Sequence, residues 1–141
     1  MRKINLGRLL LGGLVAGIVG DVLGLLVDGV LLQPFWSDDM INLGKAEFST
    51  TQIIEFNLFG LVFGIVSIWI YAAIRPRFGP GWKTAIYAGV AAWVIGILLP
   101  NTNFMIVAGL FSKHLALYTT LGGLVEVVVG TVAGAWLYKE A

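Results

Sequence analysis

Long apolar runs constrain this chain more than any other feature of its sequence. Each run is long enough to cross the roughly 30 Å hydrocarbon core of a bilayer as an α-helix. The four runs occupy residues 9–32, 51–74, 82–99 and 115–138. We therefore predict an all-α membrane protein in which four transmembrane helices form a compact bundle, a single domain over residues 1–141.

The composition indicates that lipid, rather than water, surrounds these runs. Hydrophobic residues make up 58% of the chain and charged residues 12%, about half the charged share of a soluble domain. A net charge of +1 provides no basic face for nucleic acid, and the lack of cysteine excludes disulfides, thiolate metal sites and thiol catalysis. Since we find no catalytic nucleophile or cofactor motif either, we expect no enzyme activity, metal or cofactor.

Cap and turn residues set the expected ends of the first two helices. A basic N-terminal segment also admits a signal peptide, but the first run exceeds the usual signal core of about 7–15 residues, so we expect a retained helix. Ser49 and Gln52 have the spacing of a capping box and should begin the second helix, after a polar connection over residues 33–50. The prolines and glycines of residues 75–81 should end it.

The third helix should stop at Pro100, which leaves residues 101–114 open to three interpretations. Their apolar stretch, residues 104–111, is only eight residues long, too short to span a membrane as a helix. It fits an interfacial segment, which we favour, a re-entrant loop, or a continuation of the third helix beyond a proline kink.

Basic residues gather on one side of the predicted membrane. Lys and Arg mark the cytoplasmic side of membrane proteins, so we place both termini and the central loop in the cytoplasm. Only Lys45 and Lys113 fall on the other side. The seven basic residues of the cytoplasmic side are Arg2, Lys3, Arg8, Arg75, Arg77, Lys83 and Lys139. Among them, Arg75, Arg77 and Lys83 also form a candidate site for anionic lipid headgroups, although they serve orientation equally well.

Three stretches of the chain resemble a group of small four-helix proteins of the bacterial inner membrane. They are residues 70–85 (IYAAIRPRFGPGWKTA), residues 3–8 (KINLGR) and residues 133–140 (AGAWLYKE). The resemblance implies a multi-pass protein of the bacterial inner (plasma) membrane. It brings no activity with it, so no functional residue is carried over.

Glycines spaced four residues apart mark common faces of the predicted helices, because residues i and i+4 are neighbours on a helix. Small residues let helix backbones approach closely, which is what holds helices together in lipid. We therefore predict helix–helix association, both within the bundle and in a homo-oligomer or with another membrane subunit. The pairs are Gly13 and Gly17, Gly20 and Gly24, Gly60 and Gly64, and Gly130 and Gly134.

Four acidic residues lie within the predicted spans. Counting about 1.5 Å per residue, Asp21 and Glu126 fall near the midplane, and Asp28 and Glu55 fall roughly 12 Å towards the outer face. No lysine or arginine lies at those depths, and a carboxylate at the bilayer centre costs about 2.5–3.5 kcal/mol. We predict a proton or cation site at Asp21 and Glu126, with Asp28 and Glu55 as its entrance.

Two other interpretations of these acids stay open. Protonated carboxyl groups could simply hydrogen-bond between helices, and Asp28 and Glu55 could reach the outer headgroups. The sequence accordingly predicts a protein that acts through helix association, as a homo-oligomer or accessory subunit. The alternative is a small proton- or cation-coupled transporter or channel that uses Asp21 and Glu126.

Overall fold

The computed structural model describes residues 3–140, so Arg2, counted above among the basic residues, lies outside the described part. Over these residues the chain is all-helical, with five α-helices, three π-helical segments and no strand. In chain order they are α1 (Leu6–Leu26), η1 (Val27–Leu31), α2 (Gln33–Asn42), α3 (Thr50–Phe78), α4 (Trp82–Trp93), η2 (Val94–Leu98), η3 (Asn101–Val107) and α5 (Lys113–Ala135).

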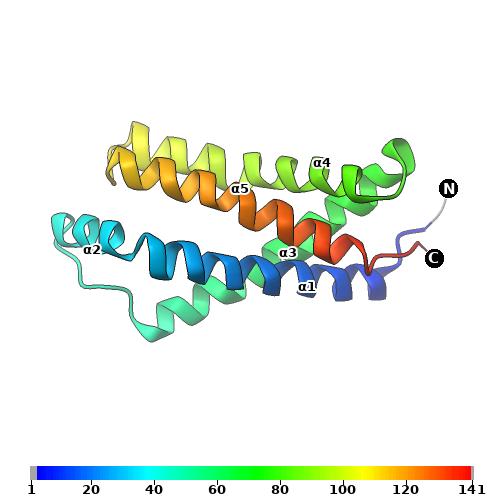
Figure 1. Ribbon diagram of the computed structural model, residues 1–141, viewed down its shortest axis with the longest axis horizontal. Coiled ribbons are helices and arrows are strands. Elements are labelled where there is room, and N and C mark those ends of the chain that lie inside the picture. Colours follow the sequence, from blue (N-terminus) through cyan, green and yellow to red (C-terminus); the bar gives the residue numbers. More distant parts are fainter. Residues whose placement is uncertain (1–2, 141) are drawn as a thin grey trace.

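Four continuous helices are long and apolar enough to cross a membrane, which confirms the predicted helical bundle with four apolar spans. They comprise Leu6–Leu31, Thr50–Phe78, Trp82–Val107 and Lys113–Ala135. Helix α1 packs against both α3 and α5, and α4 packs against α5 and α3. Figure 1 shows both termini at one end of the bundle, together with the α3–α4 turn, and α2 at the opposite end. We call these the terminal end and the α2 end.

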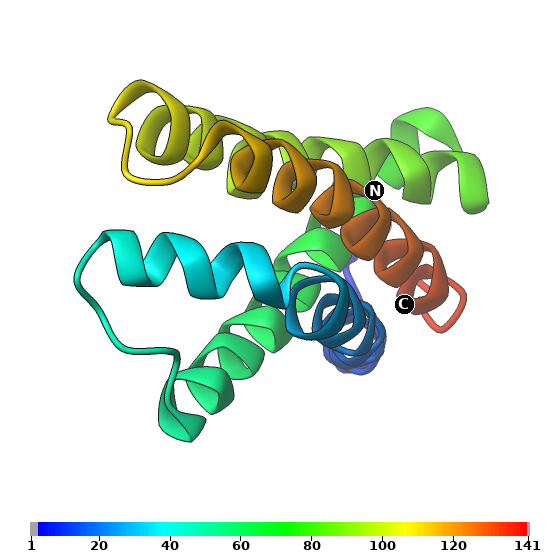
Figure 2. The same cartoon turned by 60° about the vertical axis from the view of Figure 1, so that its left-hand side comes forward.

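The helices do not stay together along their whole length. Figure 2 shows the first half of α3 running away from α4 and α5 towards the α2 end. At the terminal end the spans close on a tight core in which Ile68, Ala85 and Ala88 are fully buried. At the α2 end a separate small cluster joins Met105, Leu115 and Ala116.

Helix α3 begins as predicted but ends later. The Ser49 hydroxyl accepts a hydrogen bond from the Gln52 amide at 3.2 Å, and the Gln52 side chain accepts one from the Ser49 amide at 2.9 Å, which completes the capping box. The helix then passes through Pro76 to Phe78 instead of ending near residue 74. Pro76 removes only one helical hydrogen bond, so the helix continues past it. The helix ends at Gly79, whose φ of +85° lies outside the helical region.

The third span also continues past its predicted end at Pro100. It reaches Val107 through η2 and η3, whose wider i→i+5 turns flank the proline and accommodate it. Residues 101–107 therefore continue the third helix, and the interfacial interpretation that we favoured is wrong for them. Residues 33–42, predicted as part of a polar connection, instead form α2, with a proline in its first turn.

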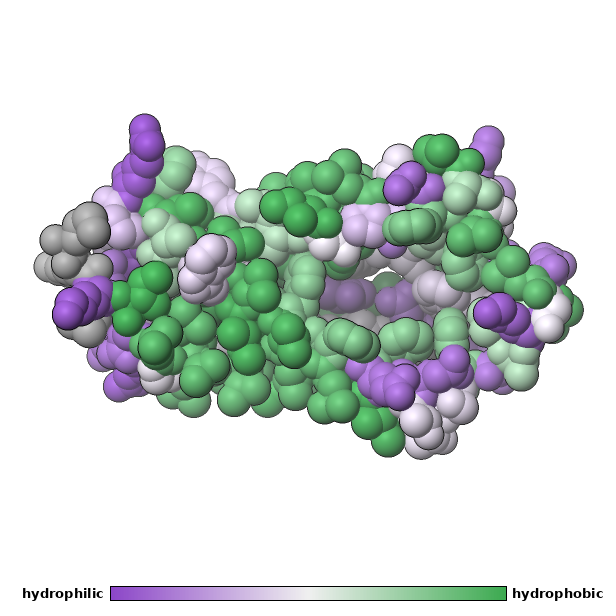
Figure 3. Space-filling view, turned by 180° about the vertical axis from the view of Figure 1, so that it is seen from behind, coloured by the Kyte–Doolittle hydropathy of each residue, from purple (hydrophilic) through white to green (hydrophobic). Residues whose placement is uncertain are grey.

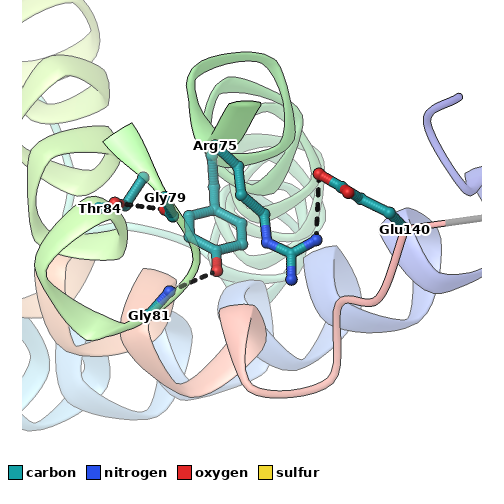
Figure 4. A network of polar contacts seen from close by, with 6 residues as sticks. Arg75, Gly79, Gly81, Thr84 and Glu140 are labelled. Atoms are coloured by element: carbon teal, nitrogen blue, oxygen red, sulfur yellow. Dashed lines mark hydrogen bonds and ion pairs between the residues drawn. The ribbon is translucent and has the colours of Figure 1, made fainter. Parts of the chain in front are cut away.

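A network of polar contacts closes the terminal end (Figure 4). Arg75 pairs with Glu140 at 3.1 Å, which joins the C-terminal segment to α3. The Thr84 hydroxyl donates to the Gly79 carbonyl at 2.7 Å, and the Gly81 amide donates to the Tyr71 hydroxyl at 3.2 Å. These bonds fix the α3–α4 turn against the bundle.

Candidate functional site

Glycines set where α3 crosses α1. A Cβ atom at Gly64 of α3 would overlap the Gly13 carbonyl oxygen and the backbone of Gly17, so the two helices touch backbone to backbone there. A Cβ at Gly17 would lie 2.6 Å from the Leu61 Cα. Two straight helices that touch at one point separate on either side of it. The crossing therefore obliges the first half of α3 to diverge from α1.

The divergence opens a groove of about 650 Å³ in the α2 half of the bundle. Residues of α1, η1, α2, α3, η2 and α5 line it, together with Glu47 and Phe48 of the loop between α2 and α3. Figure 3 shows the groove as a hollow in the apolar surface, with hydrophilic residues inside it. Its walls include five aromatic side chains, Trp36, Phe48, Phe56, Phe59 and Phe63.

Three acids form a row on the floor of the groove. Asp21 and Asp28 are seven residues apart on one face of the first span, with Gly24 between them. Glu126 of α5 covers that glycine, because a Cβ at Gly24 would lie 3.4 Å from Glu126 Oε2. Glu126 therefore lies beside the face of the first span that carries both aspartates. Gly60 of α3 makes room for the row, since a Cβ there would overlap Asp21 Oδ1.

Little in the described part of the chain neutralises this row. Asp28 Oδ1 accepts a hydrogen bond from Trp36 Nε1 at 3.0 Å. Glu126 Oε1 is buried and has no hydrogen-bond partner among residues 3–140. No lysine or arginine is among the residues that line the groove, whereas a further acid, Glu47, lies at its α2 end. A buried charge without a partner is costly, so the floor favours a positively charged occupant or a proton.

The structure brings together three of the four acids named from the sequence. Asp21, Glu126 and Asp28 share the groove, but Glu55 is exposed and does not line it. Residues two apart on a helix point about 200° apart. Ile53 and Asn57 line the groove, whereas Glu55 between them is exposed and is not among the lining residues, so it does not share the groove with Asp28.

The glycines named from the sequence all face other helices of this chain. Gly130 and Gly134 of α5 meet Ala16 and Gly12 of α1, in the same manner as the crossing of α1 with α3. Gly20 and Gly24 line the groove beside Glu126. The remaining ones, Gly13, Gly17, Gly60 and Gly64, lie between α1 and α3.

The basic residues at the terminal end are not equivalent. Arg75 is largely buried in its pair with Glu140 and lies 5.6 Å from the Tyr138 ring centroid. Arg77 and Lys83 are exposed, and Lys83 lies over the Trp82 ring. Only Arg77 and Lys83 of the predicted headgroup cluster are therefore freely presented.

Several groove residues gave no signal in the sequence. Trp36 lies in α2, in a stretch predicted to be a polar connection, and Glu47 lies in the loop after it. Neither position could be related to Asp28 or Glu126 without the path of the chain between the spans. Asn57 was detectable as a polar residue inside an apolar run.

Among residues 3–140, no group of three or more His, Asp or Glu side chains is placed to hold a metal ion. No protein-family model matches the sequence, and no curated protein or solved structure matches it either.

Proposed function

We propose that the protein is a small multi-pass protein of the bacterial inner membrane that carries positive charge through its groove, as a proton- or cation-coupled transporter or channel. The observation that supports this is the row of Asp21, Asp28 and Glu126, which lies within apolar spans and has no basic residue beside it. Ionisable residues at such positions commonly belong to ion pathways and proton relays.

The energetic argument depends on the surroundings of the acids. Each carboxylate in the row is repelled by the others, and the apolar walls weaken the screening that water would provide. A proton or a cation on the floor removes this repulsion. Loss of the occupant restores it, so the site can both bind and release positive charge.

Access to the row is one-sided. The groove opens at the α2 half, whereas the core of Ile68, Ala85 and Ala88 closes the terminal end. Transport requires a second arrangement in which the terminal end opens. The closest approach of α3 to α1 is the backbone contact around Gly64, so a rocking movement of α3 about that point is the simplest one.

Flux through reconstituted protein tests the proposal. In liposomes with a trapped pH dye and an imposed potassium potential, we expect proton or cation flux that Glu126→Gln and Asp21→Asn each lower by about tenfold or more. Glu55→Gln is the matched control, since it makes the same change on an exposed face. Flux that is indistinguishable between Glu126→Gln and the unmodified protein would contradict the proposal.

Helix association, in a homo-oligomer or as an accessory subunit of a larger complex, is the second candidate. Its support is the open side of the groove, which leaves the acids within reach of a helix from another chain (Figure 3). The glycine faces support it less than expected, because they contact helices of the same chain. Native mass spectrometry of gently solubilised protein distinguishes the two roles, since a subunit should carry a stoichiometric partner and show no flux alone.

The orientation in the membrane can be tested directly, because the chain contains no cysteine. Six of the described basic residues fall on the side of the terminal end, which we place in the cytoplasm. In intact bacterial cells, an impermeant maleimide should label Lys45→Cys at the α2 end and leave Lys83→Cys unlabelled until the membrane is opened. The reverse pattern would mean that the protein is inserted the other way round.

A further inference from the structure

We infer that the ligand of the groove is an organic cation with an apolar body, which reaches the acids sideways from the lipid through the opening between α3 and η2. This inference rests on the proposed function and names its cargo.

A bare ion does not match the size of the groove or the side chains of its walls. A volume of about 650 Å³ lies within the roughly 300–1,000 Å³ of sites for drug-sized molecules. The walls bring aromatic side chains from two elements, among them Trp36 of α2 and Phe56 and Phe63 of α3. Aromatic rings gain by burying apolar surface and attract cations to their faces. A ligand that combines both properties uses the whole cavity.

The acids on the floor of the groove favour a positively charged ligand. Asp21, Asp28 and Glu126 lie in a row, Glu126 Oε1 is buried without a partner, and no basic residue among the lining residues compensates them. A divalent or small metal ion would need several ligands converging at short range. The described residues provide no such cage. A diffuse organic charge needs only proximity to the row, not inner-sphere coordination.

The lining residues that are also exposed indicate where a ligand would enter the groove. Phe56 and Phe59 of α3 line the groove, yet 54% and 73% of their surfaces are accessible, so they form a rim that faces outwards. On the opposite rim, a Cβ at Gly96 of η2 would overlap the Phe63 ring, so α3 and η2 touch there. Figure 2 shows α3 diverging from α4 and α5 towards the α2 end, and Figure 3 shows a hollow that opens through the apolar surface. In a bilayer this surface faces lipid, which is where amphipathic cations accumulate.

Two ions of matched shape and opposite charge test whether the groove binds organic cations. We would measure saturable binding of tetraphenylphosphonium and of tetraphenylborate to the full chain in nanodiscs by equilibrium dialysis, with empty nanodiscs subtracted. We expect saturable binding of the phosphonium alone. Glu126→Gln should weaken it by about tenfold or more, since it removes a poorly solvated opposite charge. Glu55→Gln should leave it unchanged.

A second variant separates the contribution of the cavity to binding from the contribution of the acidic charge. Asn57→Trp fills the groove without altering an acid, because Asn57 lines the wall and its side chain bonds only to the Ile53 carbonyl of its own helix. We expect it to weaken phosphonium binding by a similar factor while helix content stays constant. Equal binding of tetraphenylborate, or unchanged phosphonium binding in both variants, would overturn the inference.

The flux assay shows which of the two proposals has failed. If phosphonium does not bind but proton or potassium flux still depends on Glu126, the cargo is wrong and the proposed function stands. If flux is also absent, both are wrong.

Discussion

Gly64→Ala should destabilise the folded bundle by about 2–3 kcal/mol, the upper part of the usual range for overpacking. The added methyl group would overlap the Gly13 carbonyl oxygen and the Gly17 backbone. A flexible side chain could swing aside, but these are main-chain atoms in the middle of α1, so α1 and α3 must separate along their whole contact. Helical circular dichroism during titration from mild detergent into SDS measures the change, and Gly64→Val should lower the midpoint further.

Gly29→Ala is the matched control for this substitution. Gly29 also lies in an apolar span, but a Cβ there meets nothing within 4 Å and the residue is exposed. Because alanine has a higher helix propensity than glycine, this variant should be neutral or slightly more stable. If Gly64→Ala and Gly29→Ala gave the same midpoint, α1 and α3 would not cross at Gly64, and the groove that depends on this crossing would be misplaced as well.

The spans were predictable because they depend on one local property, the length of an apolar run. Ser49 and Gln52 likewise fixed the start of α3 through a bond between neighbours in sequence. The end of the third span was not predictable in this way. Proline normally ends a helix, and the π-turns that carry the chain past Pro100 have no recognised sequence signal.

The candidate site was predictable only in part, for a geometric reason. Asp21 and Asp28 lie on one helix face, so their alignment followed from their spacing. Glu126 was predicted to lie near Asp21 only because both residues fall at the same depth in the membrane. Equal depth indicates proximity when the spans run roughly parallel. Depth does not give rotation about the helix axis, so Glu55 was placed beside Asp28 although it faces the other way. Whether two residues at one depth face each other depends on packing between helices, and here the glycine crossing decides it.

Asp39→Ala should release α2 from the bundle while the four spans stay folded. Asp39 is 7% exposed, and its Oδ2 accepts a hydrogen bond from the Ser112 amide at 2.7 Å, just before α5. Removing the carboxylate leaves a partly buried N–H without a partner, at a cost of about 1–3 kcal/mol. Amide hydrogen exchange within α2 should therefore become about 5–150 times faster, since 1.4 kcal/mol corresponds to a factor of about ten.

The neighbouring acid supplies the control for Asp39. Asp38 is exposed, so Asp38→Ala changes the same charge without a buried bond and should leave exchange in α2 as it was. The comparison bears on the groove because α2 also carries Trp36, which donates to Asp28 at 3.0 Å and contacts the Phe111 ring. If α2 loosens, Asp28 loses its donor and the groove loses one aromatic wall. Equal exchange in the two variants would mean that α2 is held by its apolar face alone, and that the Asp39–Ser112 bond does not control access to the acids.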